Sequence, residues 1–377
     1  MESTTITVNK TVMAIKANLS TLAEVYHPGV TLDEKLAEMG MGIKEFALRV
    51  SKPEKTIIAV ISGKSSITTE MAVSFENVTK IPASFWLRKQ QAYDEYLVRK
   101  RREELAVKSA EWMKKFPVRE MMKRGWLETA ETVEGKVQSL FSFFAISSRK
   151  AWEDYYLNQE LKVVFRISLS RAADPYAISA WLRQGEIVAK GMTVDREFDG
   201  TVLKNKLNEM KALMVSEAQD FFPKLQSLCS DCGVKLLLIG CLPKAPVNGA
   251  TRWIGNAPVI QLSDRYKRYD IFWFTFFHEI AHILLHGKKE VFLEDVADME
   301  TDLLKEKEAD AFSSEILLPQ SAEKEIIRSK DYSGRALKEA AKRFGTHPSV
   351  IVGRLQHKKV IGFAKNHELL KKVDFRG

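Results

Sequence analysis

The chain has 377 residues, of which 45% are hydrophobic and 28% charged, and its formal net charge at pH 7 is +9. This length predicts two to three domains of about 150 residues each, and the ordinary composition excludes a disordered chain, a collagen-like protein and a coiled-coil rod. No apolar run approaches the roughly 20 residues that a membrane span needs, and no secretory signal pattern opens the sequence. Because three clustered cysteines are too few for a disulfide framework, we expect a cytoplasmic protein without a membrane partner.

The positive charge is concentrated in two segments. Arg88 to Arg124 holds 12 Lys and Arg against 6 Asp and Glu, and Ser321 to Gly377 holds 14 against 6. Basic segments suit acidic partners such as nucleic acid. The alternative is that they are solvated helix faces.

Residues 26–98 predict a compact block of short helices, preceded by an extension over residues 1–25. Glycine, proline and Ser/Thr residues punctuate the block at the spacing of helix ends and N-caps. The expected helices contain Asp33–Glu38, Lys44–Val50, a segment from Pro53 to Gly63, Ile67–Val78 with Thr68 or Thr69 as N-cap, and a segment that begins at Ser84.

The remainder predicts a helical connector over residues 99–158 and a mixed domain over residues 159–377. The connector contains charged segments with apolar stripes. Three β-rich segments predict strands in the mixed domain: Leu161–Leu169, Val234–Ile239 and Pro258–Leu262. The predicted fold class is therefore mainly α, of the α+β type, with an all-α N-terminal domain and a small sheet in the C-terminal domain.

The segment His278-Glu279-Ile280-Ala281-His282 is a candidate metal site. On a helix, positions i and i+4 share one face, so two imidazoles can bind one Zn²⁺ from the same side. Glu279 is then placed to take a proton from the water that the metal activates. The aromatic residues before the motif predict a buried helix, in which two histidines and a glutamate need a reason such as metal binding.

A catalytic zinc needs a third protein ligand and an open position. Glu308 interrupts an apolar helical stripe of Leu304, Ala311, Phe312 and Ile316, whereas Glu306 is about 200° of rotation away and is expected to face water. This pattern favours Glu308 as the third ligand, with Glu315 as the rival.

Other candidates near the motif have supporting or structural interpretations. Asp310 is a possible partner of a ligand histidine. His286 is more consistent with a helix-end or supporting role than with a ligand. Cys229 and Cys232 form a single C-x-x-C, which indicates reduced thiols rather than a structural zinc site.

The segments HEIAHILLH, KEADAFSSEILLP, FRISLSRAADPYAISAWLRQGE and ALKEAAKRFGTHPSVIVGRLQ resemble the ImmA/IrrE family of zinc metallo-endopeptidases. The resemblance covers about Leu161 to Leu370. It implies a zincin-like domain in the cytoplasm, with one Zn²⁺ per chain, His278, His282 and Glu308 as ligands and Glu279 as the base. It also implies cleavage of a repressor protein.

The N-terminal block resembles the HigA-type antitoxin version of the XRE helix-turn-helix. HPG, SGKSSIT and FWLRKQQAYD carry this resemblance. It implies a dimeric operator-binding regulator of toxin–antitoxin type, whose third helix, Pro53 to Ile61, enters the major groove. The polar candidates for DNA contact are Glu54, Lys55, Thr56, Ser62, Lys64 and Ser65.

Two reading positions of that third helix are apolar, Ile58 and Ala59, and the block from His27 to Leu87 is electrically neutral. Since phosphate neutralisation supplies much of DNA affinity, a neutral block favours weak binding. An alternative role for the block is a platform for a dimer or a protein partner.

Two functions follow from these patterns. The first is a zinc endopeptidase coupled to a helix-turn-helix domain, which hydrolyses a repressor or a toxin-system partner. The second is a DNA-binding transcriptional regulator or antitoxin, whose zinc domain senses or binds a partner without turnover.

Overall fold

The computed structural model describes residues 25–160, 174–194, 196–287 and 299–374. The chain divides into two compact units, Met1–Lys108 and Ser109–Gly377. The described part is mainly helical with one small sheet, which confirms the predicted fold class. Among these residues, no helix is both long enough and apolar enough to cross a membrane. The finer division at residues 25, 98 and 158 remains a prediction.

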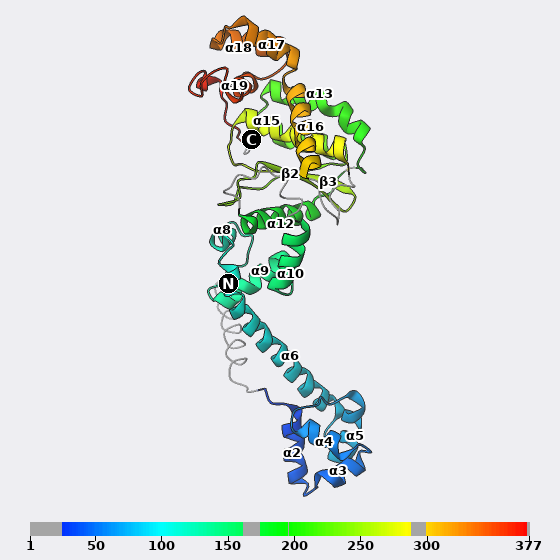
Figure 1. The fold of residues 1–377 in the computed structure, drawn as a ribbon. Coiled ribbons are helices and arrows are strands. Elements are labelled where there is room, and N and C mark those ends of the chain that lie inside the picture. The colour runs from blue at the N-terminus through cyan, green and yellow to red at the C-terminus, as the bar shows by residue number, and fades with distance from the viewer. Residues whose placement is uncertain (1–24, 161–173, 195, 288–298, 375–377) are drawn as a thin grey trace, which may run out of the picture. The chain divides into compact units, whose positions relative to one another are not determined.

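The first unit contains five helices in its described residues (Figure 1). Thr68 is the N-cap of the fourth, where its hydroxyl accepts a hydrogen bond from the backbone N–H of Met71 at 3.3 Å. Gly63 follows the third helix with a φ of +70°, which a glycine adopts without strain. Leu32, Phe46, Ile57, Phe75 and Trp86 form the fully buried centre of the unit. The helices are α2 (Pro28–Glu38), α3 (Ile43–Arg49), α4 (Glu54–Ile61), α5 (Thr69–Thr79) and α6 (Ala83–Lys108).

The second unit begins with short helices and continues into the helices and strands that surround the sheet. The first group is α7 (Ala110–Met113), α8 (Val118–Lys123), α9 (Val133–Phe144), α10 (Arg149–Trp152), the π-helix η1 (Glu153–Glu160), α12 (Pro175–Gly191), α13 (Gly200–Ser216) and α14 (Phe221–Ser230). The second group is β1 (Lys235–Leu238), β2 (Gly249–Ile254), β3 (Ala257–Leu262), α15 (Tyr269–Ala281), the π-helix η2 (His282–His286), α16 (Met299–Leu317), α17 (Gln320–Ser329), α18 (Gly334–Arg343), α19 (Pro348–His357) and the 3₁₀-helix η4 (His367–Leu369).

The three described strands form a mixed sheet in the order β1-β3-β2. β1 is parallel to β3, and β2 is antiparallel to it, with Thr251 opposite Ile260. The predicted strands at Val234–Ile239 and Pro258–Leu262 are confirmed as β1 and β3. β2 was not predicted, and the expected strand at Leu161–Leu169 lies outside the described residues.

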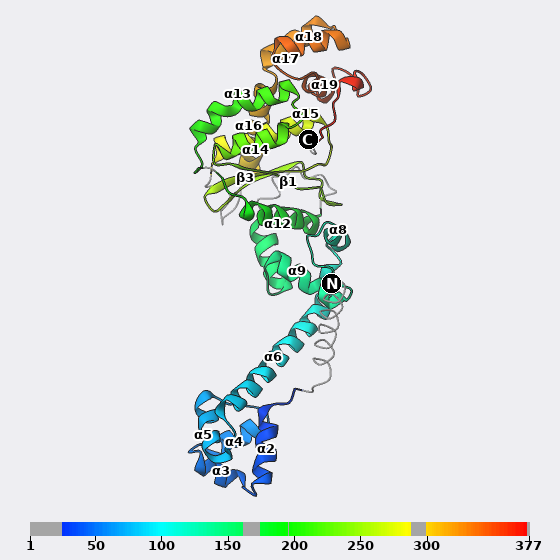
Figure 2. The ribbon, with the colours of Figure 1, turned by 180° about the vertical axis from the view of Figure 1, so that it is seen from behind.

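The sheet lies between two helical layers (Figures 1 and 2). α12 covers one face, and α14 and α15 cover the other, with α13 packed against α14 and α16 packed against α15. α15 has large apolar residues on several sides and packs against β2, β3, α16 and α19. Trp273, Phe276 and Phe277 of α15 are fully buried. The helix that carries the candidate metal site is therefore held on several sides.

Candidate metal centre

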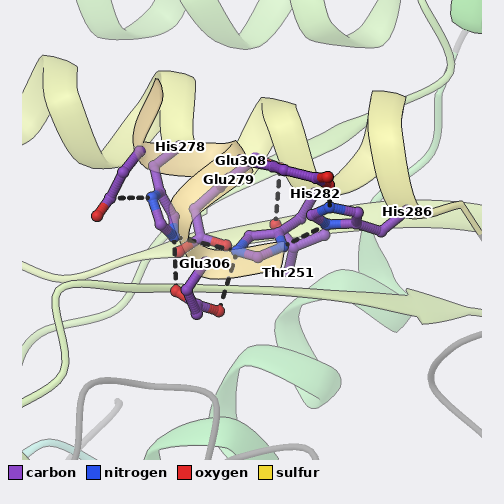
Figure 3. A network of polar contacts seen from close by, with 8 residues as sticks. Thr251, His278, Glu279, His282, His286, Glu306 and Glu308 are labelled. Atoms are coloured by element: carbon purple, nitrogen blue, oxygen red, sulfur yellow. Dashed lines mark hydrogen bonds and ion pairs between the residues drawn. The ribbon is translucent and has the colours of Figure 1, made fainter. Parts of the chain in front are cut away.

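The two histidines of the sequence motif lie at the end of α15 and the start of η2. The Nε2 atoms of His278 and His282 are 3.0 Å apart, so both rings present the same nitrogen to one point (Figure 3). Their side chains are 15% and 19% exposed, respectively. The backbone changes from α-helical to π-helical at His282, a local form that is frequent at functional sites.

A carboxylate from α16 completes this cluster. Glu306 Oε2 lies 3.2 Å from His278 Nε2, and its Oε1 lies 3.4 Å from His282 Nε2. These three residues form a possible metal site, in which one ligand atom from each lies within 4.8 Å of the other two. Glu306 was expected to face water, so the structure corrects that prediction.

Glu308, the predicted third ligand, lies elsewhere. Its side chain is 63% exposed and its Oε2 contacts His286 Nε2 at 3.1 Å. The sequence argument chose the wrong helical face: Leu304 is 57% exposed, whereas Ala309 and Ser313 are fully buried. Small buried residues three and seven positions after Glu306 place that carboxylate, not Glu308, on the face that packs against α15. The rival Glu315 instead accepts a hydrogen bond from the backbone N–H of Gln320.

The other ring nitrogens of the two histidines also have partners. Asp310 Oδ1 lies 3.0 Å from His278 Nδ1, as a supporting partner would. His286 Nδ1 lies 3.0 Å from His282 Nδ1. Both contacts are on the side of the ring away from Nε2, so they orient the rings without occupying the nitrogens that converge.

The donor set suits a divalent transition metal. Two imidazole nitrogens and one carboxylate are the protein ligands of a common type of catalytic zinc site. Tetrahedral bonds of 2.0–2.2 Å separate ligand atoms by roughly 3.3 Å, close to the 3.2 and 3.4 Å from Glu306 to the two rings. The separation of 3.0 Å between the two nitrogens is slightly shorter. The three side chains could therefore bind one metal ion, which would take the place of the direct contacts among them.

Glu279 lies beside this cluster and is only 6% exposed. Burial raises its pKa to about 7, although the charge of His278 opposes the rise. Two features of β2 accommodate it. The Thr251 hydroxyl donates to the Glu279 backbone carbonyl at 3.2 Å, and a Cβ at Gly249 would lie only 2.7 Å from Glu279 Oε1. Thr251 and Gly249 were missed from sequence because β2 itself was missed.

His278 carries a strongly shifted pKa in the metal-free protein. Burial favours the neutral ring, but hydrogen bonds to Asp310 and Glu306 and the charges of Glu279 and Glu306 outweigh it and raise the pKa to about 10. The cluster therefore attracts positive charge, which a proton supplies when no metal is bound.

The predicted DNA contacts lie at the two ends of α4. Glu54 and Lys55 are exposed in its first turn, with Thr56 half-buried beside them. After the helix, Ser62 and Lys64 are exposed and Ser65 is half-buried. These six residues thus lie on α4 and in the turn after it, and their role stays a prediction.

Within the described ranges, the two C-x-x-C thiols belong to no possible metal-binding group. Cys229 and Cys232 are free and buried, and burial raises the pKa of Cys232 to about 11. Such thiols are poor ligands and nucleophiles at neutral pH.

Separate replacement of Glu306 and Glu308 by glutamine tests which of the two carboxylates binds the metal. We expect Glu306→Gln to weaken zinc binding by more than about 100-fold, beyond the loss typical of an outer partner. Glu308→Gln serves as the matched comparison and should retain one zinc per chain, because its amide oxygen can still accept the hydrogen bond from His286. Zinc content measured by mass spectrometry after dialysis against metal-free buffer decides between them, and the reverse pattern would identify Glu308 as the ligand.

The raised pKa of His278 predicts proton release on metal binding. At pH 8.5 the ring still carries its proton, because its pKa is about 10, whereas Glu279, with a pKa of about 7, is already ionised. Coordination requires the unprotonated nitrogen, so each metal ion should displace about one proton, and affinity should rise about tenfold per pH unit below pH 10.

Calorimetric titration of zinc in two buffers of different ionisation enthalpy measures this proton. Asp310→Asn removes one group that raises the pKa of His278, so fewer protons should be released. Binding heats that do not depend on the buffer would contradict the prediction.

Comparison with known proteins found a family match in the C-terminal half of the sequence and similar proteins for a shorter segment. Residues 242–356 match the IrrE N-terminal-like domain, Peptidase_M78. Virulence-associated protein A of Dichelobacter nodosus is 36% identical over 69 residues, which cover 18% of this chain and 68% of that protein. The uncharacterized HTH-type transcriptional regulator YddM of Escherichia coli (strain K12) is 30% identical over 66 residues, 18% of this chain and 70% of that protein.

Among solved structures, an addiction module antidote protein of the HigA family from Coxiella burnetii matches at 24% identity. The match covers 29% of this chain and 100% of that one, with a TM-score of 0.21, which is too low to carry a structural argument. The domain match and the two sequence relatives carry the assignment. In part of its length the chain belongs with the HTH-type transcriptional regulators, and its residues 242–356 match an IrrE N-terminal-like domain, Peptidase_M78.

Proposed function

We propose that this protein is a zinc-dependent endopeptidase coupled to a helix-turn-helix region. The observation that carries the proposal is the convergence of two imidazole Nε2 atoms and the Glu306 carboxylate beside the buried Glu279. The Peptidase_M78 match over residues 242–356 supports a hydrolase rather than a site that only stores metal.

His278, His282 and Glu306 would hold one Zn²⁺ per chain, as a set of three protein ligands with a position left for substrate or water. The bound ion would supply Lewis acidity, which makes water a nucleophile near neutral pH and polarises the peptide carbonyl. Asp310 and His286 contact the far side of the two rings and so keep the ligand nitrogens aimed at the ion.

Glu279 would move the proton. A general base works best when its pKa lies near the operating pH, and burial places the pKa of this carboxyl at about 7. It can therefore accept a proton from the attacking water and return it to the leaving amine. The absence of a side chain at Gly249 leaves the space that its carboxylate occupies.

For the substrate we propose a repressor or a toxin-system partner protein. The similarity of the N-terminal region to an HTH-type transcriptional regulator supports this class. We further propose that the helices around α4 direct the enzyme to its target and form a homodimer.

Replacement of the base tests the hydrolase proposal. We expect Glu279→Gln to bind zinc as the wild type does, because the residue is not a ligand, but to lose cleavage by at least about 1,000-fold, since proton transfer is lost together with the charge.

The measurement is a proteome-wide labelling of new N-termini in cells that express either form. Cleavage products present only with the wild type support the proposal and identify the substrate. The same new N-termini in both, or none in either at matched expression and zinc content, would contradict it.

A second candidate function is DNA binding by a regulator whose metal domain does not turn over. The exposed Lys55 and Lys64 at the two ends of α4 and the similarity to an HTH-type regulator favour it. Binding to selected genomic fragments should then survive Glu279→Gln. Lys64→Ala should reduce the slope of log affinity against log salt by about 1, if Lys64 contacts a phosphate.

Lys35→Ala is the control, because Lys35 lies on α2 and pairs with Glu38. If no fragment is retarded at low salt, this candidate is excluded.

A further inference from the structure

His282, His286 and Glu308 are linked in this order by two polar contacts, and we refer to the three residues as the row. His282 Nδ1 lies 3.0 Å from His286 Nδ1, and His286 Nε2 lies 3.1 Å from Glu308 Oε2 (Figure 3). The middle residue of the row is well shielded, since the His286 side chain is 8% exposed, whereas Glu308 is 63% exposed. The row begins in solvent and ends at a ring of the metal cluster.

The chemistry of the row determines where each proton lies. A carboxylate only accepts hydrogen bonds, so His286 must carry a proton on Nε2 to bind Glu308. In the neutral ring the other nitrogen, Nδ1, is then an acceptor, and His282 must donate to it from its own Nδ1. A neutral His282 with its proton on Nδ1 has its lone pair on Nε2, the atom that faces His278 and Glu306.

We propose that His286 and Glu308 are positioning residues, which hold His282 in the tautomer and orientation needed to bind the metal. This inference rests on the proposed function. It assigns a role to the one histidine of HEIAHILLH that is not a ligand, and to the glutamate that the sequence suggested as a ligand.

The arrangement of α16 supports this assignment. Three carboxylates at alternate positions of one helix contact four ring nitrogens of the three histidines. Glu306 meets the two Nε2 atoms, Asp310 meets His278 Nδ1, and Glu308 meets His286, which passes the contact to His282. Each ligand ring is therefore fixed at its far nitrogen by an acidic residue of α16, directly for His278 and through one more ring for His282.

Variants of His286 separate this role from simple packing. His286→Leu introduces an apolar side chain of moderate size that fills much of the same space, and it removes both hydrogen bonds. His286→Gln can still accept from His282 through its amide oxygen and donate to Glu308 through its amide nitrogen. We expect cobalt affinity to fall roughly 10- to 100-fold in His286→Leu, the usual effect of losing such a partner, and to stay within about threefold of wild type in His286→Gln.

Glu308 provides a test at an exposed position, where loss of folding is not expected. Glu308→Ala should weaken cobalt binding by about tenfold. Lys307→Ala, at the exposed neighbouring position of the same helix, is the matched control and should have no effect. Affinity is measured by competition with a chromophoric chelator, and the visible spectrum of bound cobalt reports the ligand geometry.

Imidazole ¹H–¹⁵N correlation spectra of the zinc-loaded protein report the tautomer directly. A protected Nδ1 proton on His282 is expected in the wild type and in His286→Gln, and its loss is expected in His286→Leu. Wild-type cobalt affinity in both His286→Leu and Glu308→Ala would overturn the inference, as would equal weakening in His286→Leu and His286→Gln, which indicates packing.

These results are distinguishable from a failure of the proposed function. A wild-type protein that binds no zinc or cobalt would contradict the proposed enzyme itself. A wild type that binds metal and cleaves protein, with unaffected variants, would contradict only the role of His286 and Glu308.

Discussion

Two imidazole nitrogens that lie 3.0 Å apart, facing each other, are the constraint on which the site depends. Both cannot be unprotonated acceptors at this distance without repelling each other, so a cation or a proton must lie between or beside them. The Glu306 carboxylate strengthens this requirement by adding negative charge on the same side. This geometry favours the binding of a positive charge. In the metal-free protein that charge is a proton, which is why the pKa of His278 is raised.

Such a pair must be held by something other than its own interactions. α15 supplies that support because nearly all of its sides are buried, with Trp273, Phe276 and Phe277 completely removed from solvent. Burying a phenylalanine side chain contributes about 1.5–3 kcal/mol, so the packing of these residues stabilises the helix that holds the two rings. The sheet contributes on the other side, where Thr251 of β2 binds the backbone of Glu279 and Gly249 leaves room for its carboxylate.

The sequence predicted those helices and strands that depend on local signals, namely helix caps, glycines and apolar runs. The short helices of the first unit follow caps and glycines, and β1 and β3 follow continuous apolar runs. His278, Glu279 and His282 were found because their spacing is fixed by a single helix. β2 was missed because Gly249, its first residue, and Gly255, directly after it, resemble loop sequence, and its strand form depends on pairing with β3.

The place of Glu306 in the possible metal site was missed for a different reason, which concerns how two helices approach each other. The sequence argument followed large apolar residues, and Leu304 drew the expected contact face toward Glu308, although this leucine is 57% exposed. The face that packs on α15 is instead made by small residues, Ala309 and Ser313, and the Ser313 hydroxyl donates to the Phe274 carbonyl at 2.8 Å. Small side chains let the helices approach closely enough for a carboxylate on one to reach imidazoles on the other. Where two helices build a site between them, the small buried residues are therefore a better guide to the ligand face than the large apolar ones.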